Sequence, residues 1–332
     1  MNATEHRMPM WSMLLSVVAV IAVSVTACDR RRPEAVGDAK SPEQIVYARS
    51  RDDVVNSGVL FTPARDSAKP IAIIWIHGWG VNFYQPSYVA IGRALAQHGY
   101  TVISGNTRMH DLGNVQASRG GKRIRGGGYW GVASEEPRDL AAWIGVAESR
   151  GVGKVVLVGH SAGWSAVRSY VAQERDPRVV GIVLASGAVG PELRTPDPEQ
   201  RREAQQLMAK GEGDALVRDP KRSFPSYTSA ATFLDIAAYL ADSSARDFFG
   251  VKTANAPITR VTCPLLAFFG TKGDVGGQSD LDLLESTIRR QKSGPRSVTT
   301  KLIDGADHMY TGQEGQVAQV IASWAAGLTT SR

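Results

Sequence analysis

Apolar runs and amphipathic stretches alternate along most of the chain. The run at 71–76 is apolar throughout, as expected for a strand buried on both faces of a parallel sheet, and helical spacing of apolar residues follows it at 86–97. The strands expected are 44–48, 54–61, 71–76, 101–104, 154–158, 179–185, 264–269 and 297–303, with helices at 86–97, 135–149, 164–173 and 316–326. This alternation predicts an α/β fold with a mostly parallel central sheet and helices on both faces.

The stretch 190–256 interrupts this alternation. It contains two helix-like segments, 199–210 and 231–241, and it lacks strand patterns. We expect it to form a helical cap inserted between two parts of one core, 43–189 and 257–332.

The N-terminal region has a different character. Arg7 precedes an apolar stretch at 11–25 that ends in small residues before Cys28, which is typical of a secretion signal at 1–27. The run is also long enough for a short anchor helix that stays in the bilayer. Val25-Thr26-Ala27-Cys28 resembles the lipobox of bacterial lipoproteins, in which the signal is cut before the cysteine.

That resemblance implies a lipid on the Cys28 thiol and a protein anchored to a membrane of the bacterial cell envelope, facing the periplasm or the exterior. Residues 28–42 are then the lipidated cysteine and a tether of charged residues, small residues and proline. Arg30, Arg31 and Arg32 in this tether would lie near anionic headgroups, or else belong to a solvated linker.

Composition restricts the class of protein further. The chain is 43% hydrophobic and 21% charged, which is ordinary for a globular domain. Its net charge of +6 is not arranged on a nucleic-acid recognition motif, so no nucleic-acid partner is expected. If Cys28 carries lipid, Cys263 cannot form an intramolecular disulfide, and its position before an apolar run predicts a buried, inert thiol.

The motif that carries chemistry is Gly159-His160-Ser161-Ala162-Gly163, which matches G-x-S-x-G. This pattern forms a nucleophile elbow where a serine lies in a sharp turn between a strand and a helix. Here the apolar run 155–158 precedes it and a helix-like stretch follows it, so the surroundings match. Ser161 is therefore the predicted nucleophile.

A serine nucleophile needs a base, and the base needs a carboxylate to orient it. In folds with this elbow the order along the chain is serine, acid, histidine. Five of the six histidines precede Ser161, which leaves His308, in the loop after the last expected strand. Asp274, in the loop after strand 264–269, is the predicted acid, and Asp280 is its main competitor.

A second glycine-containing loop follows the strand at 71–76. In His77-Gly78-Trp79-Gly80 the glycines let backbone N–H groups approach a developing oxyanion. The amides of Trp79 and Ala162 are the predicted oxyanion hole, while His77 is expected to pack behind the loop.

Together these motifs resemble the esterase, lipase and serine-peptidase-like branches of the α/β-hydrolase superfamily, over about residues 43–328. The resemblance implies the α/β-hydrolase fold, hydrolysis of a small-molecule ester or acyl substrate through an acyl-enzyme intermediate, and no metal or organic cofactor. A weaker similarity, to uncharacterised α/β hydrolases and siderophore esterases, rests on Gly105-Asn106-Thr107-Arg108.

The sequence leaves several alternatives open. The same triad serves peptidases, thioesterases and lactonases, and a non-catalytic binding lipoprotein is an alternative of another class. Metal-dependent hydrolysis is disfavoured because the sequence has no H-E-x-x-H pattern. A glycine-rich loop is expected at 106–131. Either its basic residues attract anionic substrates, or the loop is solvated and its aromatic residues anchor it. The basic residues are Arg119, Lys122, Arg123 and Arg125, and the aromatic ones are Tyr129 and Trp130.

Overall fold

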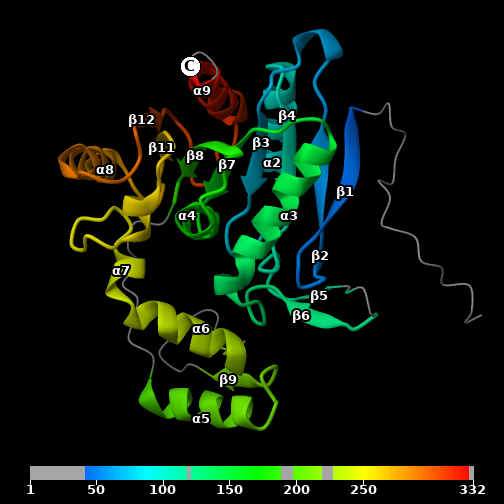
Figure 1. The fold of residues 1–332 in the computed structure, drawn as a ribbon, viewed down its shortest axis with the longest axis vertical. Helices are drawn as coiled ribbons and strands as arrows, with labels where there is room; N and C mark the ends of the chain where they lie inside the picture. Colours follow the sequence, from blue (N-terminus) through cyan, green and yellow to red (C-terminus); the bar gives the residue numbers. More distant parts are fainter. Residues whose placement is uncertain (1–41, 117, 119–120, 188–196, 219–226, 329–332) are drawn as a thin grey trace, which may run out of the picture. The chain divides into compact units, whose positions relative to one another are not determined.

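The computed structural model describes residues 42–116, 118, 121–187, 197–218 and 227–328 (Figure 1). An eight-stranded sheet in the order β1-β2-β4-β3-β7-β8-β11-β12 forms its centre. The strands of this sheet are β1 (Glu43–Arg49), β2 (Val55–Phe61), β3 (Ala72–Ile76), β4 (Thr101–Gly105), β7 (Val155–His160), β8 (Val179–Ala185), β11 (Leu265–Gly270) and β12 (Val298–Ile303). All eight were expected from the sequence, and their ends agree within two residues.

Strand directions place the ends of six strands at one edge of the sheet. β1 pairs with β2, and β2 with β4, in antiparallel fashion, whereas β4, β3, β7, β8, β11 and β12 run parallel to one another. The loops that follow these six strands therefore meet at the same edge, where ligands of open α/β sheets bind. The expected mostly parallel α/β sheet is confirmed.

Helices cover both faces of the sheet (Figure 1). One face packs against α2 (Pro86–Gln97) and α9 (Glu314–Gly327), and the other against α3 (Glu136–Ser149), α4 (Gly163–Glu174) and α8 (Gln278–Arg290). Two hydrophobic clusters result because successive strand residues point to opposite faces: Ile74 and Ile76 join the α3 side, and Ile73 and Trp75 the α2 side. Burial on both faces explains why β3 is apolar throughout.

The segment expected to be a helical cap contains three helices and a small sheet. The helices are α5 (Pro198–Ala209), α6 (Ala230–Ala241) and α7 (Ser243–Arg246), and the strands are β9 (Leu216–Arg218) and β10 (Tyr227–Ser229). The expectation that it lacks strands is therefore wrong, since three-residue strands are too short to show an alternating pattern. A separate small core forms here from Ala204, Val217, Ala230 and Phe233.

The glycine-rich loop contains a hairpin, and two of its residues contact the segment that holds α5 and α6. β5 (Asn114–Gln116) pairs with β6 (Ile124–Gly126). Farther along, the carbonyl of Tyr129 accepts a hydrogen bond from Ser229 N at 2.7 Å, and the Trp130 indole N–H donates to the Asp214 carbonyl at 3.0 Å. The two aromatic residues thus anchor the loop against the segment that holds α5 and α6.

A buried ion-pair network links the segment after β4 to α3. The Arg108 guanidinium bonds both oxygens of Asp139, at 3.0 Å each, and also reaches Asp52 at 2.9 Å. The Arg108 side chain is 5% exposed and that of Asp139 is 0% exposed. Burial raises the pKa of Asp139, and the paired guanidinium opposes this effect. The fully buried Asp139 carboxylate therefore depends on Arg108 for its positive charge, whereas Arg108 also pairs with the partly exposed Asp52.

We expect Arg108→Met to lower the free energy of unfolding by about 3–5 kcal/mol, because it leaves the buried Asp139 carboxylate without its cation. Chemical denaturation measures this. Arg93→Met is the matched control, since Arg93 makes a two-bond contact with Glu43 at the surface and its loss should matter far less. Equal unfolding midpoints for the two variants would contradict the importance of the buried network.

Candidate active site

Ser161 lies in a sharp turn between β7 and α4. Its φ of 53° places a non-glycine residue in the left-handed region, and its N–H donates to the Ala185 carbonyl at 3.0 Å. Glycines on both sides make the turn possible. A Cβ at Gly159 would lie 2.6 Å from the Gly163 carbonyl oxygen, and one at Gly163 would lie 2.5 Å from the His77 carbonyl oxygen. The elbow expected from G-x-S-x-G is present in the backbone.

His308 and Asp274 come together from the loops after β12 and β11. His308 Nδ1 lies 2.7 Å from Asp274 Oδ1. The Asp274 side chain is 0% exposed, whereas that of His308 is 30% exposed and accessible to a reactant. Burial favours the neutral acid, but hydrogen bonds from His308, Ser186 and two backbone amides outweigh it and hold the pKa of Asp274 below its usual value. The carboxylate is therefore ionised and His308 Nδ1 is the donor.

Asp280, the other candidate for the triad acid, makes a different contact. It lies in the first turn of α8, where its Oδ2 accepts the Gly277 N–H at 2.9 Å. This contact caps the helix rather than orienting a histidine. The structure thus brings Asp274, and not Asp280, to His308.

His160 connects the loop of His308 to the elbow of Ser161. The two histidine rings have centroids 4.8 Å apart, and His160 Nε2 lies 2.8 Å from the His308 carbonyl oxygen. Since that nitrogen must donate, His160 Nδ1 accepts from the Tyr88 hydroxyl at 2.7 Å. Burial lowers the pKa of His160 to about 3, so the ring stays neutral.

Among the described residues no hydrogen bond joins Ser161 Oγ to His308, a contact that often tightens only with substrate bound.

The His77 ring fixes the peptide that follows it. His77 Nε2 accepts the Thr107 N–H at 3.0 Å, so the proton is on Nδ1, which donates to the Gly78 carbonyl at 2.7 Å. Burial lowers the pKa of His77 to about 4, which keeps this arrangement neutral. In a trans peptide the C=O and N–H point in opposite directions. With the Gly78 carbonyl held by His77, the Trp79 N–H points away from that ring.

The loop that carries Trp79 lies against the elbow. A Cβ added at Gly78 would be 3.0 Å from Ser161 Cβ and 3.5 Å from Ser161 Oγ. Ala162, the residue after the serine, is exposed and directly precedes α4, where backbone N–H groups have no partner within the helix. The two amides predicted for an oxyanion hole therefore belong to segments that flank Ser161.

The Gly-Asn-x-Arg segment supports the same loop. Asn106 Oδ1 accepts the Phe83 N–H at 2.8 Å, and Thr107 supplies the N–H that fixes the His77 tautomer. A Cβ at Gly105 would lie 2.5 Å from the Trp143 ring, and Arg108 forms the buried ion pair described above. The identities of Gly105, Asn106 and Arg108 thus have a structural reason, whereas Thr107 supports the loop through its backbone.

Two residues of the site have no sequence motif that would reveal them. Ser186, at the end of β8, and Tyr310, two residues after His308, form a hydrogen bond of 2.7 Å, and Ser186 also bonds Asp274. Serine and tyrosine are common, and these positions are 88 and 124 residues from their partners. Only the folded chain brings them together.

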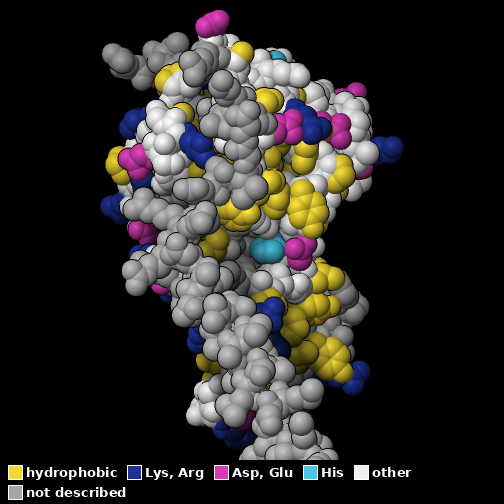
Figure 2. Space-filling view, turned by 90° about the vertical axis from the view of Figure 1, so that its right-hand side faces the viewer, with side chains coloured by type: hydrophobic (Ala, Val, Ile, Leu, Met, Phe, Trp, Pro, Cys, Tyr) yellow, Lys and Arg dark blue, Asp and Glu magenta, His cyan; other side chains and the backbone are white. Residues whose placement is uncertain are grey.

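The basic residues of the glycine-rich loop that the structure describes lie at the surface or against an aromatic ring. The Arg125 guanidinium lies over the Trp130 ring, 5.3 Å from its centroid, while Lys122 and Arg123 are exposed. Arg119 is outside the described residues. Apolar side chains are also exposed at and near the loop His77-Gly78-Trp79-Gly80, the predicted oxyanion loop. The exposed fraction is 36% for Trp79 and 37% for Leu112. Figure 2 shows apolar side chains gathered above and below a histidine on one face of the molecule.

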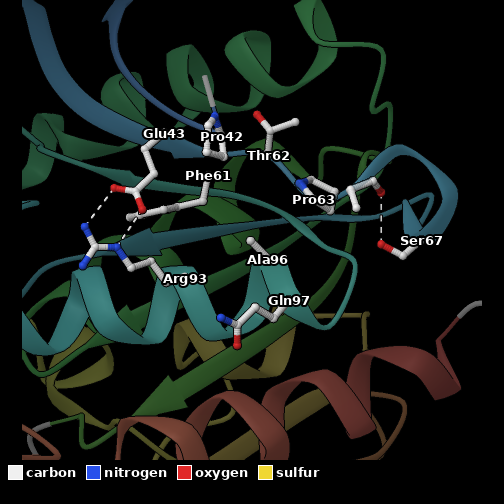
Figure 3. Close-up of a pocket in the computed structure, with 10 residues that line it drawn as sticks. Pro42, Glu43, Phe61, Thr62, Pro63, Ser67, Arg93, Ala96 and Gln97 are labelled. Carbon is white, nitrogen blue, oxygen red and sulfur yellow. Dashed lines mark hydrogen bonds and ion pairs between the residues drawn. The ribbon is translucent and has the colours of Figure 1, made fainter. Parts of the chain in front are cut away.

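A hollow elsewhere on the surface is unrelated to these residues. It lies between β2 and α2, with a volume of about 330 Å³, and the Arg93–Glu43 ion pair lies at its rim (Figure 3). Phe61, which lines it, pairs with Val102 near the start of β4. The hollow is therefore at the edge of the sheet opposite the elbow.

Neither thiol nor metal chemistry is indicated by the described residues. Cys263 is 5% exposed, and burial raises the pKa of its thiol to about 11, as expected for an inert cysteine. The part of the chain that the structure describes contains no group of three or more His, Cys, Asp or Glu side chains suited to a metal ion.

Comparison with known proteins agrees with this geometry. The family model described as "Alpha/beta hydrolase family" matches residues 73–320. The chain belongs to this α/β-hydrolase family. Among solved structures, Est1E from Butyrivibrio proteoclasticus with ferulic acid bound has a TM-score of 0.59 at 15% identity, over 86% of this chain and 100% of that one. A thermostable carboxyl esterase from Bacillus coagulans has a TM-score of 0.59 at 15% identity, over 87% and 99%.

A curated relative shares part of the sequence. Phospholipase YtpA of Bacillus subtilis (strain 168) is 30% identical over 127 residues, which is 38% of this α/β hydrolase and 44% of the relative. The match therefore spans less than half of either protein.

Proposed function

We propose that this α/β hydrolase cleaves a carboxylic ester of a small molecule through an acyl-enzyme intermediate, with Ser161 as nucleophile, His308 as base and Asp274 as acid. The observation that carries the proposal is the 2.7 Å contact between a buried, ionised Asp274 and a partly exposed His308 at the sheet edge that holds the Ser161 elbow. A catalytic triad requires this combination of roles.

The chemistry follows from where the protons are. With Asp274 holding the proton on His308 Nδ1, the Nε2 of the ring is free to accept the Ser161 hydroxyl proton as Oγ attacks the ester carbonyl. The tetrahedral intermediate collapses when the imidazolium returns that proton to the leaving alcohol. Water then attacks the acyl-enzyme with His308 as base again, which releases the carboxylic acid and restores the serine.

The developing oxyanion would be bound by the Trp79 and Ala162 amides. The orientation of the Trp79 N–H away from His77, and the closeness of Gly78 to Ser161, support this role for the first amide. The second is the amide after the nucleophile, at the N-terminal end of α4. Donors fixed before the reaction starts stabilise the intermediate most effectively.

The choice of an ester among acyl substrates is supported by similarity. The two solved structures compared above are an esterase with ferulic acid bound and a carboxyl esterase, and the curated relative is named a phospholipase. Peptidase, thioesterase and lactonase activities use the same groups, and a non-catalytic binding protein would use none of them. Activity measurements separate these alternatives.

Wild-type protein should react covalently with a fluorophosphonate probe and hydrolyse p-nitrophenyl acyl esters, and Ser161→Ala should do neither. His308→Ala should lower turnover by several orders of magnitude, and the double variant should be no worse than Ser161→Ala, because the groups act as a unit. Labelling is read on a gel and turnover by absorbance. Folded wild-type protein that neither labels nor turns over would instead favour the binding protein.

Gly78→Ala should reduce kcat by about 10²-fold, because its methyl group would press on Ser161 Cβ and displace the adjacent amide. Gly145→Ala is the matched control. It lies within α3 where a Cβ meets nothing within 4 Å, so activity should be unchanged and unfolding should require about 0.5–1 kcal/mol more. Similar kcat values for the two variants would count against the role of this loop.

We also propose that Cys28 is lipidated and that the enzyme is anchored to a membrane of the bacterial cell envelope, facing the periplasm or exterior. The support is the sequence Val25-Thr26-Ala27-Cys28, which lies outside the described residues. In the part of the chain that the structure does describe, none of the helices is long and apolar enough to cross a bilayer. Attachment through acyl chains would need no such helix.

Cys28→Ser should move the protein from the detergent phase to the aqueous phase in detergent partitioning of cell extracts, because the thiol that carries the lipid is lost. Metabolic labelling with a fatty-acid analogue should disappear in parallel. Cys263→Ser is the control and should keep both properties. Unchanged partitioning of Cys28→Ser would remove the argument for a lipid anchor.

A further inference from the structure

We propose that Ser186 and Tyr310 are positioning residues that hold the Asp274 carboxylate in the orientation required by His308. This inference rests on the proposed function, since it assigns how the acid of the proposed triad is held. Neither residue belongs to the G-x-S-x-G motif or to the oxyanion loop.

The Asp274 carboxylate is surrounded by four donors. Its Oδ1 accepts from His308 Nδ1 and from the Val275 N–H, each at 2.7 Å. Its Oδ2 accepts from the Gly270 N–H at 2.6 Å and from the Ser186 hydroxyl. Two of these donors come from the segment of Asp274 itself, at the end of β11 and in the loop after it, and a third is the histidine that Asp274 orients. The fourth, Ser186, directly follows β8 and ties the carboxylate to that neighbouring strand.

Tyr310 fixes the direction of the Ser186 hydroxyl. The two hydroxyl oxygens are 2.7 Å apart. Because Ser186 gives its proton to Asp274, Tyr310 must be the donor to Ser186 Oγ. Burial raises the pKa of Tyr310 well above its usual value, so that proton is retained at any pH at which the protein works. The bonds therefore run in one direction, from Tyr310 through Ser186 to Asp274.

The loop that carries His308 thus reaches the carboxylate twice. His308 bonds Oδ1 directly, and Tyr310, two residues later, reaches Oδ2 through Ser186. The Tyr310 ring packs against Trp75 and Phe268, with centroids 6.5 and 5.7 Å away. Any rotation of the carboxylate would break contacts at both ends of this closed arrangement.

The backbone at both residues is strained. Ser186 has φ of 48° and Tyr310 has φ of 61°, in the region that favours glycine. Strained residues persist where their surroundings hold them, and they gather at functional sites. Glycine at 186 would relieve the strain but would supply no hydroxyl. The presence of serine there is explained if the hydroxyl is needed.

Loss of the hydroxyl should act on the chemical step rather than on substrate binding. We expect Ser186→Ala, Ser186→Gly and Tyr310→Phe to lower kcat by about 10- to 100-fold with KM nearly unchanged, because the base is less well oriented. The glycine variant should also melt at a higher temperature than the alanine variant, since both lack the hydroxyl and only glycine relaxes φ.

The acid side of the pH profile gives a second readout. The titratable groups that face Asp274 are His308 and Tyr310 from the loop after β12 and His160 from the end of β7. The Ser186 hydrogen bond lowers the pKa of Asp274, so its removal raises that pKa. The carboxylate is then protonated at a higher pH, so the low-pH end of the kcat/KM profile, where Asp274 titrates, should move upward.

The control is Tyr170→Phe, which removes a hydroxyl–carboxylate bond of 2.7 Å to Asp176 from another buried tyrosine. It should leave kcat and the pH profile unchanged. If Ser186→Ala and Tyr310→Phe keep kcat within twofold of wild type, or if Tyr170→Phe lowers kcat equally, the inference is overturned. Failure of the proposed function would appear differently, as wild-type protein that shows no Ser161-dependent labelling or turnover.

Discussion

The left-handed backbone at Ser161 is the constraint on which the rest of the site depends. A serine with φ of 53° can be reached by a reactant only if nothing large surrounds the turn, and the chain meets this condition with Gly159, Gly163 and Gly78. The first two let β7 pass directly into α4, and the third lets the loop after β3 approach the serine. Since β3 and β7 are neighbours in the sheet, their register brings the two loops together.

Two buried histidines serve as scaffolding around this turn, and their neutrality is essential. His77 and His160 each accept a hydrogen bond on one ring nitrogen and donate one from the other, so a second proton on either ring would break a contact. Burial lowers the pKa of both rings and prevents this. His308 differs because it is partly exposed and bonds an ionised carboxylate, which suits a group that gains and loses a proton.

Much of the fold could be predicted from the sequence because strands buried on both faces leave an apolar run that needs no further context. The short strands β5, β6, β9 and β10 could not, since three residues give no periodicity. For the site, Ser161 was predictable from its motif and His308 by elimination, as it is the one histidine after the serine. For the acid the sequence offers both Asp274 and Asp280, and the contacts of both carboxylates were needed to distinguish them.

The residues that support the site were not predictable, for a physical reason. Ser186 and Tyr310 act through hydroxyl groups whose partners are 88 and 124 residues away, and Thr107 acts on His77 through its backbone N–H, so none of them imposes a pattern on its neighbours. Such bonds are recognised only when the fold places donor and acceptor together.

These supporting bonds share a feature that links them to the buried Arg108 network. In each case buried polar groups rely on a small number of specific partners within the protein, an arrangement that contributes little to net stability. Arg108 fixes the start of the glycine-rich loop to α3, and Asn106 and Thr107, just before it, hold the oxyanion loop. A small displacement of Arg108 would thus be transmitted through two neighbouring residues to the peptide beside Ser161. The position of the peptide beside Ser161 therefore depends in part on buried contacts behind the loop that carries it.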